Sequence, residues 1–426
     1  MFKTNKLKSG LEVIAAPVKG TKTVTVLAMV ATGSRFENRQ NSGLSHFLEH
    51  MFFKGTIKRP TTLAISSALD RVGGEFNAFT GKEYTGYFVK VAAEYLELAL
   101  DVLSDMLLNS KFDEAEIERE KGVVIEELNM YLDNPVIYIE DLFEECLYGD
   151  TPAGRDTIGT RESIAGFNRA QILNYFGTQY GADKMIVSLA GQFKPEAIKL
   201  VGRYFKDLKE KKYQDKLATN NEQSGPKLNV HYKATDQAHL SLGVRAAAYN
   251  EPDELATKII AIILGGSMSS RLFTELRERR GLAYYVRSHH EPYTDSGYLT
   301  TQAGVPIKKL PEAVKIILAE YEKIITKPIA AEELNRVKQY IIGRTALQLE
   351  ASDSVASWYG RQAILLKEQA RSAKVEAPEE YFKKIKNLTA AEINRVAKNI
   401  FVNSKLNLAV IGPYKKTGEL EKLLHI

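Results

Sequence analysis

The second half of the chain repeats the pattern of its first half. Residues 23–50 (TVTVLAMVATGSRFENRQNSGLSHFLEH) and 239–266 (HLSLGVRAAAYNEPDELATKIIAIILGG) both run from a strand-forming stretch through an acidic turn into a helical stretch. Residues 184–191 (KMIVSLAG) and 405–412 (KLNLAVIG) match at a similar offset of a little over 200 residues. A repeat on this scale indicates an internal duplication, and therefore two domains of one fold.

Hydrophobic periodicity gives the class of that fold. Residues 11–32 are rich in Val, Ala and Thr and are broken by Lys-Gly-Thr, which predicts two strands, and residues 73–91 predict an antiparallel pair. Apolar residues recur at three and four positions from Ser42 onward, as on a helix with one buried face. Further elements are predicted as helices at 61–72, 93–109, 113–132 and 168–180 and a strand at 185–191. We expect an α+β fold of two homologous domains, each a mainly antiparallel sheet with helices packed on it.

The length and a polar central segment place the domain boundaries. A chain of 426 residues is too long for one compact core. Residues 206–229 contain few apolar residues, no clear periodicity and a Ser-Gly-Pro, which is typical of a linker. We place an N-terminal domain at 1–212, the linker at 213–229 and a C-terminal domain at 230–426.

Composition excludes several classes of function. The 58 Lys and Arg residues exceed the 53 Asp and Glu residues by only five and are interspersed with them, which argues against nucleic-acid binding. No uninterrupted apolar stretch approaches the length of a transmembrane helix, so no membrane partner is expected. Cys146 is the only cysteine, and the N-terminus lacks the apolar run of a secretory signal. A reducing, cytoplasmic location fits these features.

The stretch SHFLEH contains a candidate metal site. His46 and His50 are four residues apart, so on a helix they project from one face and can share an ion. Two imidazoles suit Zn²⁺, which in catalytic sites takes a third protein ligand, while Glu49 beside the ion could accept a proton from water. A solvated helix face could carry the same residues. However, the corresponding helix of the second half (DELATKIIAIILGG) has no histidine, which favours a chemical role over a folding role.

The third ligand is predicted on a second helix, within residues 118–133 (EREKGVVIEELNMYLD). Glu120 and Glu127 are seven residues apart and therefore lie on one face. An apolar stripe is expected beside them, formed by Val123, Val124 and Leu128. Spacing alone does not distinguish Glu127 from Glu126 as the ligand.

These residues carry a resemblance to a known family. HFLEH has the form His-x-x-Glu-His, the inverted zinc motif of the inverzincins. The chain resembles the pitrilysin-like (insulinase) family of zinc peptidases, in its short two-domain type similar to the β subunit of the mitochondrial processing peptidase. Four blocks carry the likeness in the family order. They are residues 42–56, residues 73–87, the helix that begins at Glu118, and residues 269–286.

The resemblance implies a role for each motif residue. It makes His46 and His50 the histidine ligands of one Zn²⁺ per chain and Glu49 the general base. In this family the third ligand lies about 76 or 77 positions after the second histidine, and another functional glutamate precedes it by seven positions. This spacing implies that Glu127 is the ligand and Glu120 the supporting carboxylate.

The resemblance also implies how substrate is bound. Asn77, Ala78, Phe79 and Thr80 match the edge strand along which family members bind the substrate backbone, although by sequence alone they would be an ordinary hairpin strand. Arg277 and Tyr284 match the family's Arg/Tyr pair, which reaches substrate from the second domain. By sequence alone, Arg277 is one of three arginines in a charged run, for which a solvated surface is the ordinary explanation.

The function that follows is that of a zinc-dependent metalloendopeptidase. It would hydrolyse unfolded peptides inside a chamber formed by two chains, because family chambers contain four such domains and this chain supplies two. The implied partner is a second copy, in a homodimer, or a related chain, in a heterodimer. The alternatives are a non-catalytic scaffold and a processing-complex subunit that requires a different partner.

Overall fold

The structure is a computed structural model that describes residues 2–211, 215–369 and 374–426. The chain folds into two compact units, each assembled from separate stretches of sequence. The first unit comprises residues 1–128, 156–217 and 344–378, and the second comprises 129–155, 218–343 and 379–426. The predicted domain end at residue 212 and the linker residues 213–214 lie outside the described residues, and the predicted boundaries stay a prediction.

The first unit is built on a six-stranded sheet with the order β1-β2-β6-β3-β5-β4. Neighbouring strands are antiparallel except for β2 and β6, which are parallel. The strands are β1 (Lys3–Lys6), β2 (Glu12–Pro17), β3 (Thr23–Val30), β4 (Glu75–Thr80), β5 (Thr85–Ala92) and β6 (Met185–Gly191). Strand β4 therefore lies at one edge.

The second unit is built on a five-stranded sheet with the order β7-β11-β8-β10-β9. Its strands are β7 (Lys227–Tyr232), β8 (Gln237–Arg245), β9 (Tyr285–Pro292), β10 (Gly297–Pro306) and β11 (Leu406–Gly412), and again one pair, β7 and β11, is parallel. Five strands of the first sheet, from β2 to β4, thus have counterparts in the same order. The predicted fold class is confirmed, with two mainly antiparallel sheets covered by helices.

The described helices of the first sequence half are α1 (Leu44–Met51), α2 (Thr62–Asp70), α3 (Leu96–Asn109), α4 (Glu114–Asp133), α5 (Pro135–Tyr148), α6 (Arg161–Gly166), α7 (Arg169–Gln179) and α8 (Ala197–Tyr204). Five of them match predicted helices, whereas α5, α6 and α8 were not predicted. The second half contributes α9 (Glu254–Gly265), α10 (Leu310–Thr326), α11 (Ala331–Gln348), α12 (Ser352–Glu368), α13 (Pro378–Asn387), α14 (Ala390–Ile400) and α15 (Gly418–Glu421). Within the described residues, no helix is both long and apolar enough to cross a membrane.

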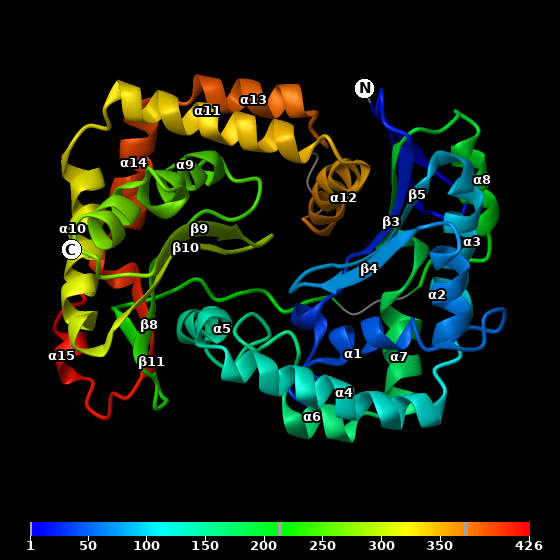
Figure 1. Cartoon of the computed structure of the whole chain (residues 1–426), viewed down its shortest axis with the longest axis horizontal. Helices are drawn as coiled ribbons and strands as arrows, with labels where there is room; N and C mark the ends of the chain where they lie inside the picture. The colour runs from blue at the N-terminus through cyan, green and yellow to red at the C-terminus, as the bar shows by residue number, and fades with distance from the viewer. Residues whose placement is uncertain (1, 212–214, 370–373) are drawn as a thin grey trace. The chain divides into compact units, whose positions relative to one another are not determined.

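Helix α12 covers one face of the first sheet, although it comes from the second half of the sequence. Figure 1 shows α12 on one side of this sheet and α3 on the other. The Ser352 hydroxyl shares hydrogen bonds with those of Thr23 (3.0 Å) and Thr25 (2.8 Å) on β3. At the other end of α12, Glu368 forms a buried ion pair with Lys184 at 2.7 Å.

Helix α5 likewise packs against the sheet of the other half of the chain. It comes from the first half of the sequence and packs against β8 and β11 of the second sheet. The buried Glu144 carboxylate accepts hydrogen bonds from the hydroxyls of Tyr293 and Tyr298, and Arg245 donates to the Leu147 carbonyl at 2.6 Å. Each sheet therefore depends on a helix from the other half of the chain.

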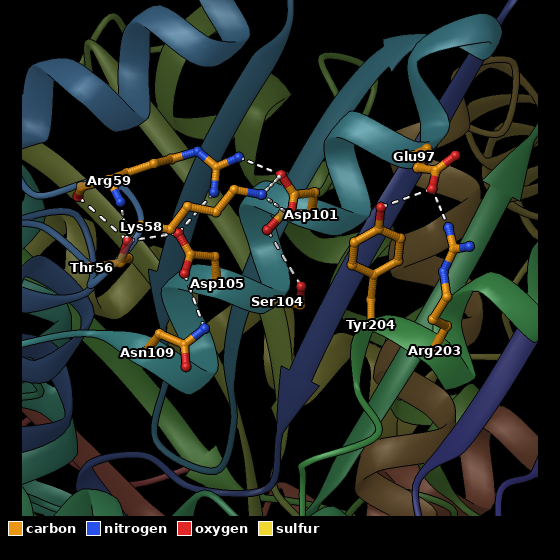
Figure 2. Close-up of polar contacts among 10 residues, drawn as sticks. All are labelled: Thr56, Lys58, Arg59, Glu97, Asp101, Ser104, Asp105, Asn109, Arg203 and Tyr204. Atoms are coloured by element: carbon orange, nitrogen blue, oxygen red, sulfur yellow. Dashed lines mark hydrogen bonds and ion pairs between the residues drawn. The ribbon is translucent and has the colours of Figure 1, made fainter.

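Polar contacts join α3 to the neighbouring elements on its face of the first sheet. Glu97 on α3 accepts hydrogen bonds from Arg203 and Tyr204 at the end of α8 (Figure 2). One and two turns further along α3, Asp101 and Asp105 bind Arg59 in the segment between α1 and α2. These contacts fix α3 between its neighbours.

The helix exchange predicts that neither sequence half folds alone. In a fragment of residues 1–217, α5 would lose its sheet, and the burial of its large apolar side chains is worth on the order of 10 kcal/mol, comparable to the whole stability of a domain. We expect fragments 1–217 and 218–426 to be unfolded separately and to form a soluble complex when co-expressed, as measured by circular dichroism and size-exclusion chromatography. A cooperative thermal transition from either isolated fragment would contradict the interdependence of the halves.

Candidate metal centre

Helix α1 presents the two histidines from one face while its opposite face is buried. Leu44, Phe47, Leu48 and Met51 are almost wholly inaccessible to solvent. His46 and His50 lie on the remaining face, with ring centroids 4.7 Å apart. The i, i+4 spacing thus brings both imidazoles to one point, as predicted.

Glu127 of α4 completes a group of three metal-ligating side chains. Its Oε2 lies 3.7 Å from His46 Nε2 and 3.4 Å from His50 Nε2. A tetrahedral zinc ion with ligands at about 2.0–2.2 Å places them about 3.3–3.6 Å from one another. The three ligand atoms all lie within 4.8 Å of one another, so their spacing and chemistry fit one Zn²⁺ ion.

The structure shows which of Glu126 and Glu127 faces the two histidines. Glu127 faces the histidines, whereas Glu126 is exposed and belongs to no such group. Val124 and Leu128 are buried, as predicted for the apolar stripe, but Val123 is 49% exposed. The inclusion of Val123 was wrong, because consecutive helical residues point about 100° apart and only Val124 can face inward here.

Glu120 orients His50. Its Oε1 lies 2.8 Å from His50 Nδ1, which leaves Nε2 directed at Glu127. A carboxylate on the distal nitrogen fixes the ring and tautomer of a metal-binding histidine. Glu120 is only 2% exposed and is also paired with Lys54 at 2.5 Å, so its charge is balanced on both sides.

Burial and charge shift the two histidines in opposite directions. Burial lowers the pKa of His46 to about 4, and the neighbouring His50 adds to this effect. Burial also acts to lower the pKa of His50, but hydrogen bonds with Glu120 and Glu127 outweigh it and raise that pKa to about 9. A cation that binds the Nε2 atoms of these histidines competes with protons for them, so its affinity depends on pH.

Glu49, next to the candidate ligand His50 in the sequence, is held by strand β4. Its carboxylate accepts a hydrogen bond from the Thr80 hydroxyl at the end of that strand. Burial raises the pKa of Glu49 above its ordinary value, although the bond from Thr80 opposes the rise. A carboxylate with a raised pKa is a stronger base in the neutral range, which suits proton transfer.

Strand β4 offers an open edge next to this carboxylate. It pairs with β5 from Glu75 to Thr80 and, in the described part of the chain, with no other strand. Asn77 is exposed, while Ala78, Phe79 and Thr80 are half-buried. An open edge can accept an extended peptide as an additional strand.

Comparison with known proteins assigns the chain to a family. Residues 13–161 match the family model described as Insulinase (Peptidase family M16), and residues 166–341 match the one described as Peptidase M16 inactive domain. A Bacillus subtilis (strain 168) relative named "Uncharacterized zinc protease YmxG" is 35% identical over 97% of this chain and 98% of its own length. The chain belongs to peptidase family M16, the insulinase family.

Other proteases match this chain over almost their whole length. An uncharacterized zinc protease of Rickettsia bellii (strain RML369-C) is 36% identical over 98% of this chain and 99% of its own. The crystal structure of a protease from Helicobacter pylori superimposes with a TM-score of 0.90 at 25% identity, covering 97% of this chain and 99% of that one. The predicted family is therefore confirmed, together with its association with zinc proteases.

The second unit contains the predicted Arg/Tyr pair, and its helix α9 has no histidine. Helix α9 is apolar where α1 carries its ligands, as predicted. Arg277 lies in the π-helical segment η4 (Phe273–Glu278), with its guanidinium carbon 5.6 Å from the ring centroid of Tyr284. Tyr284 is 78% exposed directly before β9, so it is available to a ligand. The roles assigned to these two residues stay predictions.

Sequence reasoning missed Lys54 and one role of Thr80 at this site. Lys54 neutralises Glu120, and its signal was present, since it follows His50 by one further helical turn. Thr80 was predicted only as part of the substrate strand, yet its side chain holds Glu49. This second contact joins residues 31 positions apart and has no periodic signal in the sequence.

The Lys54 contact predicts that its loss weakens metal binding. Lys54→Met leaves the buried Glu120 carboxylate without its cation, which we expect to cost about 1–3 kcal/mol of stability and about 10-fold in zinc affinity. Thermal unfolding and competition with a chromophoric chelator measure the two effects. Lys121→Met is the matched control, because Lys121 pairs with the exposed Glu118, and such pairs contribute about 0–1 kcal/mol. Equal effects in both variants would refute the role of Lys54.

Proposed function

We propose that this chain is a zinc-dependent metalloendopeptidase that hydrolyses unfolded peptides, with one Zn²⁺ per chain. The observation that carries the proposal is the convergence of His46, His50 and Glu127 on one point. Glu49 stands beside that point and is hydrogen-bonded to the edge strand. A ligand set, a base and a peptide-binding edge in one place are the parts that peptide hydrolysis requires.

The proposed reaction assigns proton transfer to Glu49. A bound Zn²⁺ would polarise the scissile carbonyl and lower the pKa of water from its bulk value toward about 7. Glu49 takes a proton as the water oxygen adds to the carbonyl carbon. The C–N bond then breaks, and Glu49 delivers the same proton to the leaving nitrogen. Thr80 keeps the Glu49 carboxylate in place throughout.

The substrate is proposed to be an extended peptide paired with β4. Main-chain hydrogen bonds along Asn77–Thr80 would bind peptides with little regard to side chains, which suits unfolded substrates of varied sequence. Arg277 and Tyr284 are proposed to donate hydrogen bonds to the substrate from the second unit. Donors of this kind that act on developing negative charge contribute about 2.7–4 kcal/mol to the lowering of the barrier.

A scaffold role is the less well supported alternative. A non-catalytic member of this fold has no need of three ligands, a base and a carboxylate that orients one histidine. Here three ligands lie at ligand distance, Glu120 bonds His50, and the charge of Glu49 interacts with those of His50 and Glu127. The same observation therefore favours the enzyme.

The proposal predicts distinct outcomes for the base and the ligand. Glu49→Gln removes the proton acceptor and leaves the ligands intact, so we expect zinc to stay bound while kcat for a fluorogenic peptide falls about 10²–10⁴-fold. Glu127→Gln removes a ligand, so zinc affinity itself should fall, whereas the neighbouring Glu126→Gln should bind zinc normally. Metal content and peptide turnover measure both effects. Undiminished turnover in Glu49→Gln would contradict its role as base.

The proposed chamber of two chains predicts a homodimer. Light scattering after size-exclusion chromatography should give twice the chain mass of 47.6 kDa, and these fractions should cleave peptides without any added protein. A chain that is monomeric and inactive until a related chain is added would instead identify it as one subunit of a heterodimeric processing peptidase.

A further inference from the structure

The helix that carries the zinc motif has no capping side chain of its own. Its N-cap residue is Gly43, in the left-handed region with φ 90°. A Cβ atom at Gly43 would lie 2.3 Å from the carbonyl oxygen of Ile158, so no residue with a side chain fits there. The free N–H groups at the start of α1 must therefore be bound by another part of the chain.

Glu37 supplies that cap from six residues upstream. Its Oε2 accepts a hydrogen bond from the Gly43 N–H at 2.7 Å, and its Oε1 accepts one from the Ser45 N–H at 2.6 Å. The residue is only 4% exposed, so both bonds are shielded from water. Charge-assisted hydrogen bonds of this length are roughly twice as strong as neutral ones.

A second contact holds the same point of the helix. The Ser45 hydroxyl lies 2.7 Å from the Tyr175 hydroxyl, which in turn lies 2.9 Å from that of Thr32. Ser45 is therefore fixed through its main chain by Glu37 and through its side chain by Tyr175. The next residue in the sequence is the ligand His46, so any shift of Ser45 is transmitted directly to the metal centre.

We infer that Glu37 is a positioning residue of the metal centre, which sets the place of α1 and thereby of His46 and Glu49. This inference rests on the proposed peptidase function. An eight-residue helix has little stability of its own, so its position depends on such contacts. Glu37 touches neither substrate nor ligand and acts only through the first turn of α1.

Glu37 caps α1 through its negative charge as well as through the positions of its two oxygens. Glu37 places negative charge at the positive end of the helix dipole, and its two oxygens both accept. An amide at this position has one acceptor oxygen and an NH₂ group that would face a main-chain N–H. Burial raises the pKa of Glu37 to about 7, while its bonds with Ser45 and Gly43 and the charge of Lys82 hold it down.

The test compares Glu37→Gln with a buried carboxylate that does not touch α1. Asp105 on α3 is likewise 4% exposed and binds Thr56, Arg59 and Asn109 (Figure 2). Asp105→Asn therefore controls for the loss of a buried charge. The readouts are zinc affinity by chelator competition, the visible absorption spectrum of the Co²⁺-substituted protein, and kcat and KM for a peptide.

The inference predicts that only Glu37→Gln disturbs the metal centre. Its zinc affinity and kcat should fall about 10–100-fold, the Co²⁺ spectrum should change, and KM should stay near the wild-type value. Asp105→Asn should lose thermal stability yet keep the wild-type affinity and spectrum, and Glu37→Asp should recover part of the loss. Wild-type affinity and spectrum in Glu37→Gln, or an equal loss in Asp105→Asn, would overturn the inference.

Two further outcomes separate this inference from the proposed function. If Glu37→Gln does not fold, Glu37→Asp tests the positioning role instead. This variant keeps the negative charge, but its side chain is one methylene group shorter. Reduced affinity with an altered spectrum supports the positioning role, and wild-type values overturn it. A wild-type chain that binds zinc but cleaves no peptide contradicts the proposed function, while the affinity and spectrum still measure the role of Glu37.

Discussion

The position of α1 is the constraint on which the metal centre depends. This short helix carries both histidines and the proposed base, and its apolar face is wholly buried. At its start, the close approach of Gly43 to Ile158 excludes a conventional cap. Beyond its end, Lys54 binds the carboxylate that orients His50. The ligands meet Glu127 because the helix is held at both ends.

The second unit has the same fold without the histidine ligands, so the fold does not require the metal site. The second sheet repeats the order of five strands of the first, and its α9 is packed through Ile259, Ile260, Ile263 and Leu264 with no histidine. Two polar ligands on a helix at this place are therefore compatible with the architecture but are not required by it. The exchange of α5 and α12 between the halves makes each unit depend on both copies, so the copy without ligands remains essential to folding.

Much of the fold and of the candidate site could be predicted from the sequence, because periodicity reports local geometry. Spacing of four residues placed His46 and His50 together, and spacing of seven residues placed Glu120 and Glu127 on one face. Periodicity could not separate Glu127 from Glu126, since the choice depends on how α4 packs. It also could not show which sheet α5 covers, or that Glu37 caps α1, because such contacts join distant residues without a repeating pattern.

The central claim is that His46, His50 and Glu127 bind one zinc ion, and anomalous X-ray diffraction at the zinc absorption edge tests it most directly. Crystals of the zinc-loaded chain should show one anomalous peak per chain, about 2.0–2.2 Å from both histidine nitrogens and from a Glu127 oxygen. The two nitrogens should be Nε2, because Glu120 occupies Nδ1 of His50. A zinc peak at other residues, or a loaded chain with no peak between α1 and α4, would contradict the account.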